Sequence, residues 1–192
     1  MTLQPASGAR DLNPQQVRKN HLIAAKLSSL YQLWGYERIS PPHIERLDTL
    51  MAAGGISNNE ILKIVSDEPL GLRPEITASI VRAASTRFNE YERPLRFWST
   101  GTSFKCNQNI DGGIDIEESF QSGVELIGTK AISAEIELLS LLIESLKVIE
   151  IDHNYEMTLL IGNTYLLELI LNSFDSNRRD KIKSILCDLD YI

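Results

Sequence analysis

The sequence predicts an α+β fold in which an antiparallel sheet is flanked by helices. Strand-like segments joined by short, hairpin-like connections are interspersed with long stretches of helical apolar spacing. A parallel α/β fold would instead alternate strands and helices regularly. We expect one domain over residues 1–192. Because the chain ends a few residues after an apolar helix, we expect the natural polypeptide to continue.

The N-terminal part begins with a long amphipathic helix. Asn13 can act as the N-cap, Pro14 occupies the first helical position, and apolar residues keep helical spacing until Gly35. A short strand is expected over residues 36–39, closed by two prolines. A helix is expected over residues 44–53, ending at a glycine pair.

The central part is predicted to contain two hairpin-like units. Residues 61–65 and 71–73 flank a turn, and Pro74 begins a helix running to about residue 86, with Glu75 in its first turn. Residues 96–104 and 119–127 are predicted to be an antiparallel strand pair around a polar loop. The remaining expected elements are a helix from Ser133 to 149, a strand over 156–161, and helices over 164–174 and 177–187.

Composition narrows the classes of function. The 192 residues are 43% hydrophobic, so the chain can form a hydrophobic core. Its net charge of −7 repels the phosphates of nucleic acids and anionic membranes. Cys106 and Cys187 lie far apart and outside any CxxC spacing, which is typical of the reducing cytoplasm. The N-terminus lacks an apolar leader, and no apolar stretch approaches membrane-spanning length. We therefore expect a cytoplasmic protein with no nucleic acid or membrane partner.

The segment over residues 119–127 contains a candidate ligand-binding face. Strand alternation places Gln121, Gly123 and Glu125 on one face, and Phe120, Val124 and Leu126 on the other, which we expect to be core. Glycine between an amide and a carboxylate leaves room for a small ligand, and these groups can hold an amino group or an imidazole N–H. A solvent-facing half of the strand is the alternative.

A second candidate site lies at the start of the helix after Pro74. Glu75 and Thr77 place a carboxylate and a hydroxyl beside each other there. Simple stabilisation of the helix dipole by Glu75 is the alternative interpretation.

Metal sites have weak support. Residues 107–118 nearly match an EF-hand loop, but its first position is Asn107 instead of aspartate and its flanks are predicted strands, whereas an EF-hand needs helices. The three histidines, His21, His43 and His153, are isolated. We therefore expect no metal, with a calcium-binding module kept as a minor alternative.

Five motifs in order resemble the catalytic core of class II histidyl-tRNA synthetases, from residue 8 to about 165. They are Gly8-Ala9-Arg10-Asp11, Gly35-Tyr36-Glu37-Arg38-Ile39 with Pro41-Pro42-His43-Ile44-Glu45, Leu72-Arg73-Pro74-Glu75-Ile76-Thr77, Phe104-Lys105, and Gln121-Ser122-Gly123-Val124-Glu125-Leu126-Ile127-Gly128. The resemblance implies that residues 36–45 build a homodimer interface. It also implies that Glu75, Thr77, Gln121 and Glu125 hold histidine.

The chain departs from that family where ATP would bind. The resembled pattern clamps ATP with arginines and a glutamate, but these positions carry Lys105, Asn107 and Glu117 here. Lysine cannot reproduce the bidentate contact of a guanidinium, and the surrounding acidic side chains would repel a triphosphate. We therefore expect no adenylation and no catalytic residue.

A synthetase-like fold that keeps its amino-acid contacts but loses the ATP clamp resembles the regulatory subunits of ATP phosphoribosyltransferase. That resemblance implies a non-catalytic protein, without cofactor, about twice this length. It would assemble with the short catalytic subunit, activate it, and contribute to feedback by free histidine at the first step of histidine biosynthesis. A divergent or truncated histidyl-tRNA synthetase is the alternative.

Overall fold

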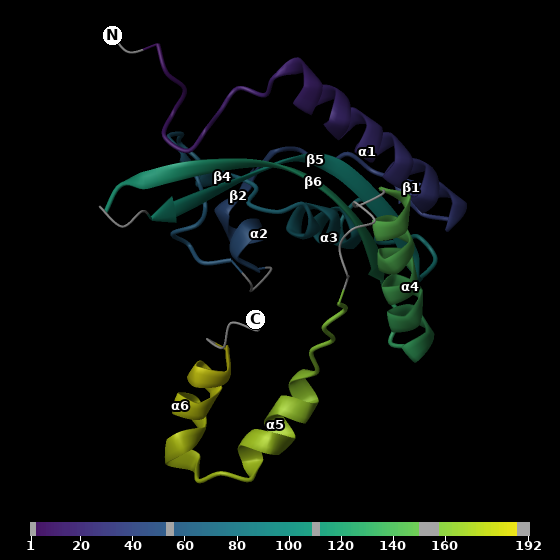
Figure 1. The fold of residues 1–192 in the computed structure, drawn as a ribbon, viewed down its shortest axis with the longest axis vertical. Helices are drawn as coiled ribbons and strands as arrows, with labels where there is room; N and C mark the ends of the chain where they lie inside the picture. Colours follow the sequence, from purple (N-terminus) through teal and green to yellow (C-terminus); the bar gives the residue numbers. More distant parts are fainter. Residues whose placement is uncertain (1–2, 53–55, 109–111, 150–157, 188–192) are drawn as a thin grey trace. The chain divides into compact units, whose positions relative to one another are not determined.

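The computed structural model describes residues 3–52, 56–108, 112–149 and 158–187 (Figure 1). The chain divides into two compact units, Met1–Ile151 and Asp152–Ile192, and each is described by itself. The first unit combines two sheets with helices, which confirms the predicted α+β class.

The first helix, α1 (Pro14–Leu33), begins and ends where local chemistry predicts. Asn13 accepts a hydrogen bond from the Gln16 backbone N–H at 2.9 Å, and the Gln16 side chain accepts from the Asn13 N–H at 3.0 Å. These reciprocal bonds form a capping box that satisfies two free donors. Gly35 follows the C-cap with a φ of 78°, a left-handed conformation that favours glycine.

The larger sheet contains β1 (Glu37–Arg38), β5 (Leu95–Gln108) and β6 (Ile114–Ile127) in the order β1-β5-β6. The predicted antiparallel pair is confirmed: Leu95 lies opposite Ile127, and the pairing continues to Gln108 opposite Ile114. Both strands extend beyond their predicted ends, so the predicted loop over residues 106–118 is largely wrong. Cross-strand pairing overrides the polar composition of this segment. Residues 109–111 lie outside the described part.

The smaller sheet contains β2 (Ile44–Arg46), β4 (Leu70–Leu72) and β3 (Lys63–Ile64), in the order β2-β4-β3. Antiparallel pairing of β3 with β4 confirms the predicted hairpin. The helix predicted over residues 44–53 is partly wrong, because its first three residues form β2 and only α2 (Leu47–Ala52) is helical. Pairing of β2 with the distant β4 decides the backbone here, and residue 53 lies outside the described part.

Two helices begin at other residues than predicted. Helix α3 (Thr77–Ser85) starts after Ile76, so Glu75 precedes the helix. The prediction that Glu75 lies in the first turn is therefore wrong. Helix α4 (Ile132–Val148) has Ala131 at its N-cap, so Ser133 lies inside the helix and is not its cap.

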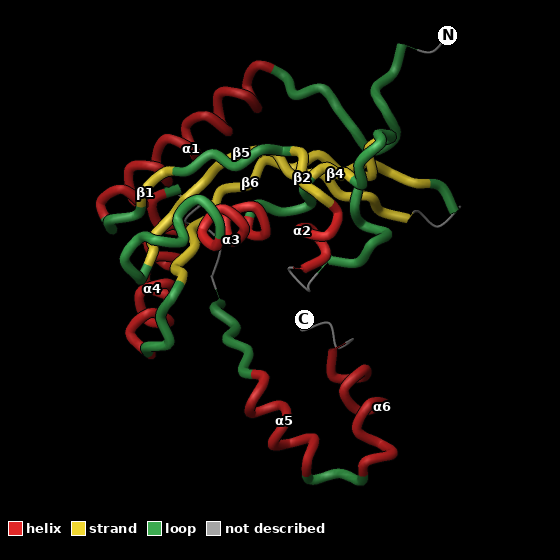
Figure 2. The backbone as a smooth tube through the Cα atoms, turned by 180° about the vertical axis from the view of Figure 1, so that it is seen from behind, coloured by secondary structure: helices red, strands yellow, loops and turns green. Residues whose placement is uncertain are grey.

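The larger sheet separates two hydrophobic clusters. On one face, α1 and α4 contribute Leu27, Tyr31 and Leu141, which pack around the fully buried Trp98. On the other face, Ile76 and Ile80 pack with Ala84, Leu95 and Phe97. Figures 1 and 2 show α1 on one side of the β5–β6 ribbon and α3 on the other. The candidate ligand face of β6 is the one that faces α3.

Polar contacts attach α4 to the sheet. Arg96 donates two 2.8 Å hydrogen bonds to the Glu137 carboxylate, and the Tyr36 hydroxyl donates a third at 2.9 Å. Arg96 holds the pKa of Glu137 below its usual range, which keeps the carboxylate ionised.

The second unit contains α5 (Thr164–Asn172) and α6 (Ser176–Cys187), which confirms both predicted helices. The Asn163 side chain caps α5 by accepting from the Leu166 N–H at 3.0 Å. Residues 158–161 form no strand, so that part of the predicted strand over 156–161 is wrong; residues 156–157 lie outside the described part. In the described ranges, no helix combines the length and apolar character needed to cross a membrane.

A buried arginine connects the two sheets. Arg73 is 1% exposed; its Nη1 donates to the carbonyls of Pro41 and Pro42 at 3.0 and 3.2 Å, and its Nε donates to that of Thr102 at 3.1 Å. Burial lowers the pKa of Arg73, and the nearby Glu45 carboxylate opposes that effect. A side chain at Gly101 would put its Cβ 2.4 Å from Arg73 Nη2, so glycine is required where β5 passes this guanidinium.

Replacing Arg73 with lysine should destabilise the full-length protein by about 3 kcal/mol or more, because one ammonium cannot reach three carbonyls from different segments. Urea denaturation measures the change. The control is Arg46→Lys, at an exposed ion pair with Asp48, which should stay within about 0.5 kcal/mol of the parent. Equal stability of the two variants would contradict this role for Arg73.

Candidate functional site

The face of β6 toward α3 has an open position in its middle. Glu125 lies opposite Phe97, which packs against α3, and strand alternation puts Gln121 and Gly123 on the same face. A Cβ added at Gly123 would meet no atom within 4 Å. On the opposite face Val124 packs against the core as predicted, but Phe120 is 49% exposed, so its predicted core position is wrong. Only the end of β6 near Trp98 is covered by the hydrophobic cluster of α1 and α4.

Gln121 joins this strand to the start of α3. Its Oε1 accepts a 2.9 Å hydrogen bond from the backbone N–H of Ile76, the N-cap residue of α3. Among the described residues none accepts a hydrogen bond from its amide nitrogen, so both N–H donors remain for a ligand. The bond also holds Thr77, the next residue, close to β6.

Glu125 is the most perturbed carboxyl group at this site. Burial raises its pKa, the neighbouring Glu75 carboxylate raises it further, and a hydrogen bond from the Thr77 side chain opposes the rise. The carboxylates of Glu125 and Glu75 and the hydroxyl of Thr77 therefore lie close together in a partly desolvated environment. A cation bound there would relieve the repulsion between the carboxylates.

A cavity of about 490 Å³ adjoins these carboxylates between α2 and α3. Glu75 and Thr77 line it; Gln121 and Glu125 do not, and reach it through their contacts with Ile76 and Thr77. All four predicted ligand-binding residues thus meet at one end of α3. The full lining is Thr49, Ala52, Glu75, Thr77, Ala78, Val81, Arg82 and Ser85.

An ion pair that was not predicted from the sequence lies beside this cavity. Glu45 is 6% exposed and accepts three hydrogen bonds of 2.8 to 3.1 Å from Arg82 of α3. Assigning residue 45 to a helix concealed the pairing, whereas its true strand β2 lies beside β4, which leads into α3. Arg82 is four positions after Ala78, so the two residues share the cavity side of α3, and this helical spacing was the available signal.

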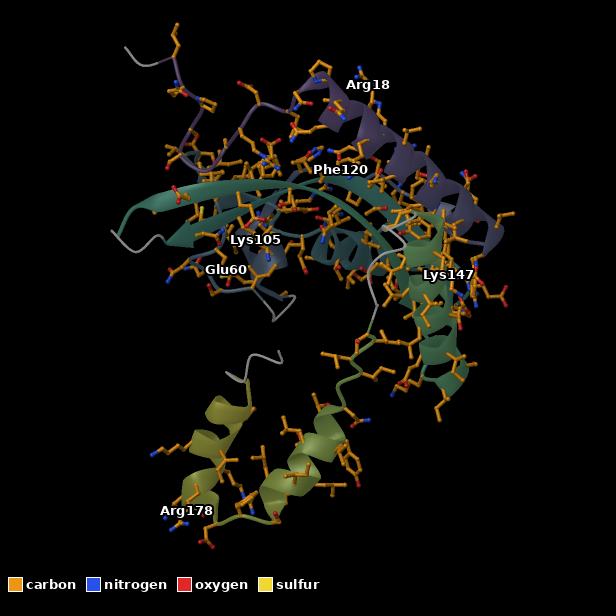
Figure 3. The ribbon with its side chains drawn as sticks, in the orientation of Figure 1. Arg18, Glu60, Lys105, Phe120, Lys147 and Arg178 are labelled. Atoms are coloured by element: carbon orange, nitrogen blue, oxygen red, sulfur yellow. The ribbon has the colours of Figure 1, made fainter. Side chains whose placement is uncertain are left out.

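The three positions that depart from the ATP clamp also lie together. Lys105 is opposite Glu117 in the β5–β6 ladder, and the Glu117 carboxylate accepts from Ser119 Oγ at 2.8 Å and from Asn107 Nδ2 at 3.0 Å. Hydrogen bonds from Ser119 and Asn107, followed by the charge of Lys105, hold the pKa of Glu117 below its usual range. The charge of Lys105 also acts on Glu60, which lies near it in Figure 3. This cluster therefore pairs a cation with carboxylates of the chain itself.

The calcium alternative gains no support from this ribbon. Strands flank residues 109–113, as predicted, and Asp115 accepts a hydrogen bond from Ser7 Oγ. Within the described ranges no group of three His, Cys, Asp or Glu side chains is arranged to hold a metal ion.

Comparison with known proteins shows that the chain is similar to histidyl-tRNA synthetases and related proteins. The family model described as Histidyl-tRNA synthetase matches residues 8–192. An ATP phosphoribosyltransferase regulatory subunit of Prochlorococcus marinus (strain NATL1A) is 92% identical over all 192 residues, which amount to 49% of that protein. The chain thus spans about half the length of the curated relatives it matches.

Solved structures agree with the fold. A crystal structure described as an ATP phosphoribosyltransferase regulatory subunit/histidyl-tRNA synthetase from Bacillus halodurans C has a TM-score of 0.85 at 26% identity, covering 96% of this chain and 48% of that one. A histidyl-tRNA synthetase from Nostoc sp. PCC 7120 has a TM-score of 0.78 at 16% identity, covering 100% of this chain and 45% of that one. The second likeness bears on fold alone.

Thr77→Val should raise the pKa of Glu125 further, because it removes the hydrogen bond that favours the ionised carboxylate. The carboxyl carbon shift of Glu125, followed by NMR across pH in the full-length protein, gives the midpoint. Thr49→Val, at the α2 wall of the same cavity, is the control and should leave the midpoint unchanged. An unchanged or lower midpoint in Thr77→Val would refute the contact.

Proposed function

Because the chain belongs to the histidyl-tRNA synthetase family, we propose that it forms part of a non-catalytic regulatory subunit of ATP phosphoribosyltransferase. The protein assembles with the short catalytic subunit at the first step of histidine biosynthesis, activates it, and binds free histidine as a feedback signal. Residues 36–45 contribute to a homodimer within that complex.

The names of the relatives support this role. Proteins 92% and 54% identical to this chain over its whole length are both called ATP phosphoribosyltransferase regulatory subunits. These relatives are about twice as long, so partners and regulation of the whole protein are part of the proposal.

The contrast between two ends of one sheet face carries the proposal. At one end Glu75, Thr77, Gln121 and Glu125 come together at the start of α3, where Glu75 and Thr77 line a cavity and the carboxylates suit an ammonium or imidazolium group. At the other end Glu117 stands where the resembled ATP clamp has an arginine, and its carboxylate is bonded to Asn107 and Ser119. Amino-acid recognition without nucleotide binding is the chemistry that this arrangement favours.

The anionic end argues against the alternative, a divergent histidyl-tRNA synthetase. The α-phosphate of ATP would meet Glu117 instead of a guanidinium, with a further carboxylate nearby at Glu60. The amino-acid positions do not discriminate between the two functions, because both bind histidine.

The full-length protein should catalyse no histidine-dependent exchange of pyrophosphate into ATP above a no-enzyme control, because it lacks the guanidinium clamp for the α-phosphate. An active histidyl-tRNA synthetase serves as the positive control. The full-length protein should also co-purify with the short catalytic subunit and raise its rate. Exchange above background, or a catalytic subunit that neither binds nor responds, would contradict the proposed function.

Glu125→Ala should weaken histidine binding to the full-length protein about tenfold or more, since a charge-assisted hydrogen bond contributes roughly 1.5–3 kcal/mol. Isothermal titration calorimetry measures the dissociation constant. Glu118→Ala is the matched control, because alternation puts this glutamate on the opposite face of β6. Unchanged affinity in a folded Glu125→Ala protein would place the histidine site elsewhere.

A further inference from the structure

A second cavity, of about 590 Å³, lies between the segment that follows β1 and the C-terminal end of α3. Three arginines line it, Arg38, Arg82 and Arg87, and among the described residues no aspartate or glutamate does. The chain as a whole carries a net charge of −7, so this cavity runs against the charge of the molecule. The other lining residues are Ile39, Ser40, Pro41, Pro42, Ala83, Phe88 and Tyr91.

The guanidinium of Arg87 is free to bind a ligand. Arg87 is exposed, and in the described part of the chain it forms no hydrogen bond or ion pair. Basic side chains often cap the last carbonyls of a helix, but those of α3 already have other donors. The carbonyl of Ala83 accepts from the Phe88 N–H, and that of Ala84 accepts from Arg93 Nη2.

Arg82 presents an oriented donor to the same cavity. Its Nε and Nη2 donate to the carboxylate of Glu45 at 2.8 to 3.1 Å, whereas Nη1 has no acceptor among the described residues. Glu45 is 6% exposed and balances one positive charge, so the three arginines keep an excess over this carboxylate. Because Glu45 already fixes the side chain, Nη1 can bind an anion with little further loss of entropy.

We propose that this cavity binds a small phosphate-bearing molecule, with its phosphate group between Arg82 and Arg87. Guanidinium groups match phosphate oxygens in geometry and in charge, and a tetrahedral phosphate can accept from two of them at once. The volume lies in the range of small-molecule sites, and the apolar parts of the wall, such as Phe88, strengthen the attraction between the charges. The site is separate from the histidine site proposed above and does not depend on it.

Arg38 adds positive charge without contacting the phosphate. Its guanidinium lies 5.3 Å from the centroid of the Trp98 ring, a cation–π arrangement, and Trp98 belongs to the hydrophobic cluster on the α1 face of the sheet. Ile39, the next residue, packs with the cluster on the α3 face, where the cavity lies. The contacts therefore fall to Arg82 and Arg87.

The test is calorimetric titration of the full-length protein with pyrophosphate, which presents phosphate without an organic group. The parent should bind pyrophosphate, and its affinity should fall as the salt concentration rises. Citrate, a tricarboxylate of similar charge, should bind more weakly, because its oxygens do not surround one centre as those of a phosphate do.

Three variants locate the contact. Arg87→Gln should weaken pyrophosphate binding about tenfold or more, because it removes a charge-assisted contact. Arg82→Lys keeps a charge for Glu45 but loses the planar fork, and should weaken binding about threefold or more. Arg18→Gln is the matched control: it removes one positive charge from α1, on the other side of the sheet, and should stay within about twofold of the parent (Figures 1 and 3).

A full-length parent that binds no pyrophosphate would overturn the proposal, including the case in which a second copy covers residues 38–42. Equal affinity for citrate, parental affinity in folded Arg87→Gln, or an equal loss in Arg18→Gln would also overturn it, because charge alone would then attract the anion. None of these results bears on histidine binding, which the Glu125→Ala titration tests separately.

Discussion

The guanidinium of Arg73 is the contact on which the first unit depends. Three backbone carbonyls, from the Pro41-Pro42 segment and from β5, accept hydrogen bonds from one buried side chain, that of the residue directly after β4. Arg73 also donates its N–H to His43 and accepts from the Phe104 N–H, so its main chain and side chain join the same segments. The two sheets and the start of α3 are thereby fixed relative to one another. Burying this charge without its acceptors would be strongly unfavourable, so Arg73 can be buried only when the segments that carry the acceptors are in place.

The candidate site follows directly from that framework. Arg73 is four positions before Thr77, so the residue that locks the sheets also sets where α3 begins. Gln121 then binds the Ile76 N–H, and Thr77 meets Glu125. Further along α3, Glu45 and Arg82 connect the helix to the smaller sheet. Gln121, Thr77 and Arg82 are each oriented by a second polar group, which is how a site keeps its geometry before a ligand arrives.

Local chemistry predicted some elements well and could not reach others. Asn13 and Gln16 lie three residues apart, so the cap of α1 depends on neighbours alone, and the alternation that grouped Gln121 with Glu125 is a property of one strand. Residues 44–46 became a strand because β4 lies beside them, a partner more than twenty positions away in sequence. Phe120 is exposed because the helices cover only part of the ribbon. The Glu45–Arg82 pair depends on the same distant contact, so helical spacing could place Arg82 on the cavity side of α3 but could not identify Glu45 as its partner.

The raised pKa of Glu125 has a consequence for how the site exchanges protons with solvent. A carboxyl group whose pKa is higher in the folded protein than in the unfolded chain keeps its proton to a higher pH than usual. A cation bound beside Glu125, as proposed, would stabilise the ionised form of this carboxyl group and would release its proton. Ligand binding and proton release would then be one linked equilibrium, in which protons compete with the cation for the Glu125 carboxylate. The site would thus report the concentration of its ligand relative to that of protons.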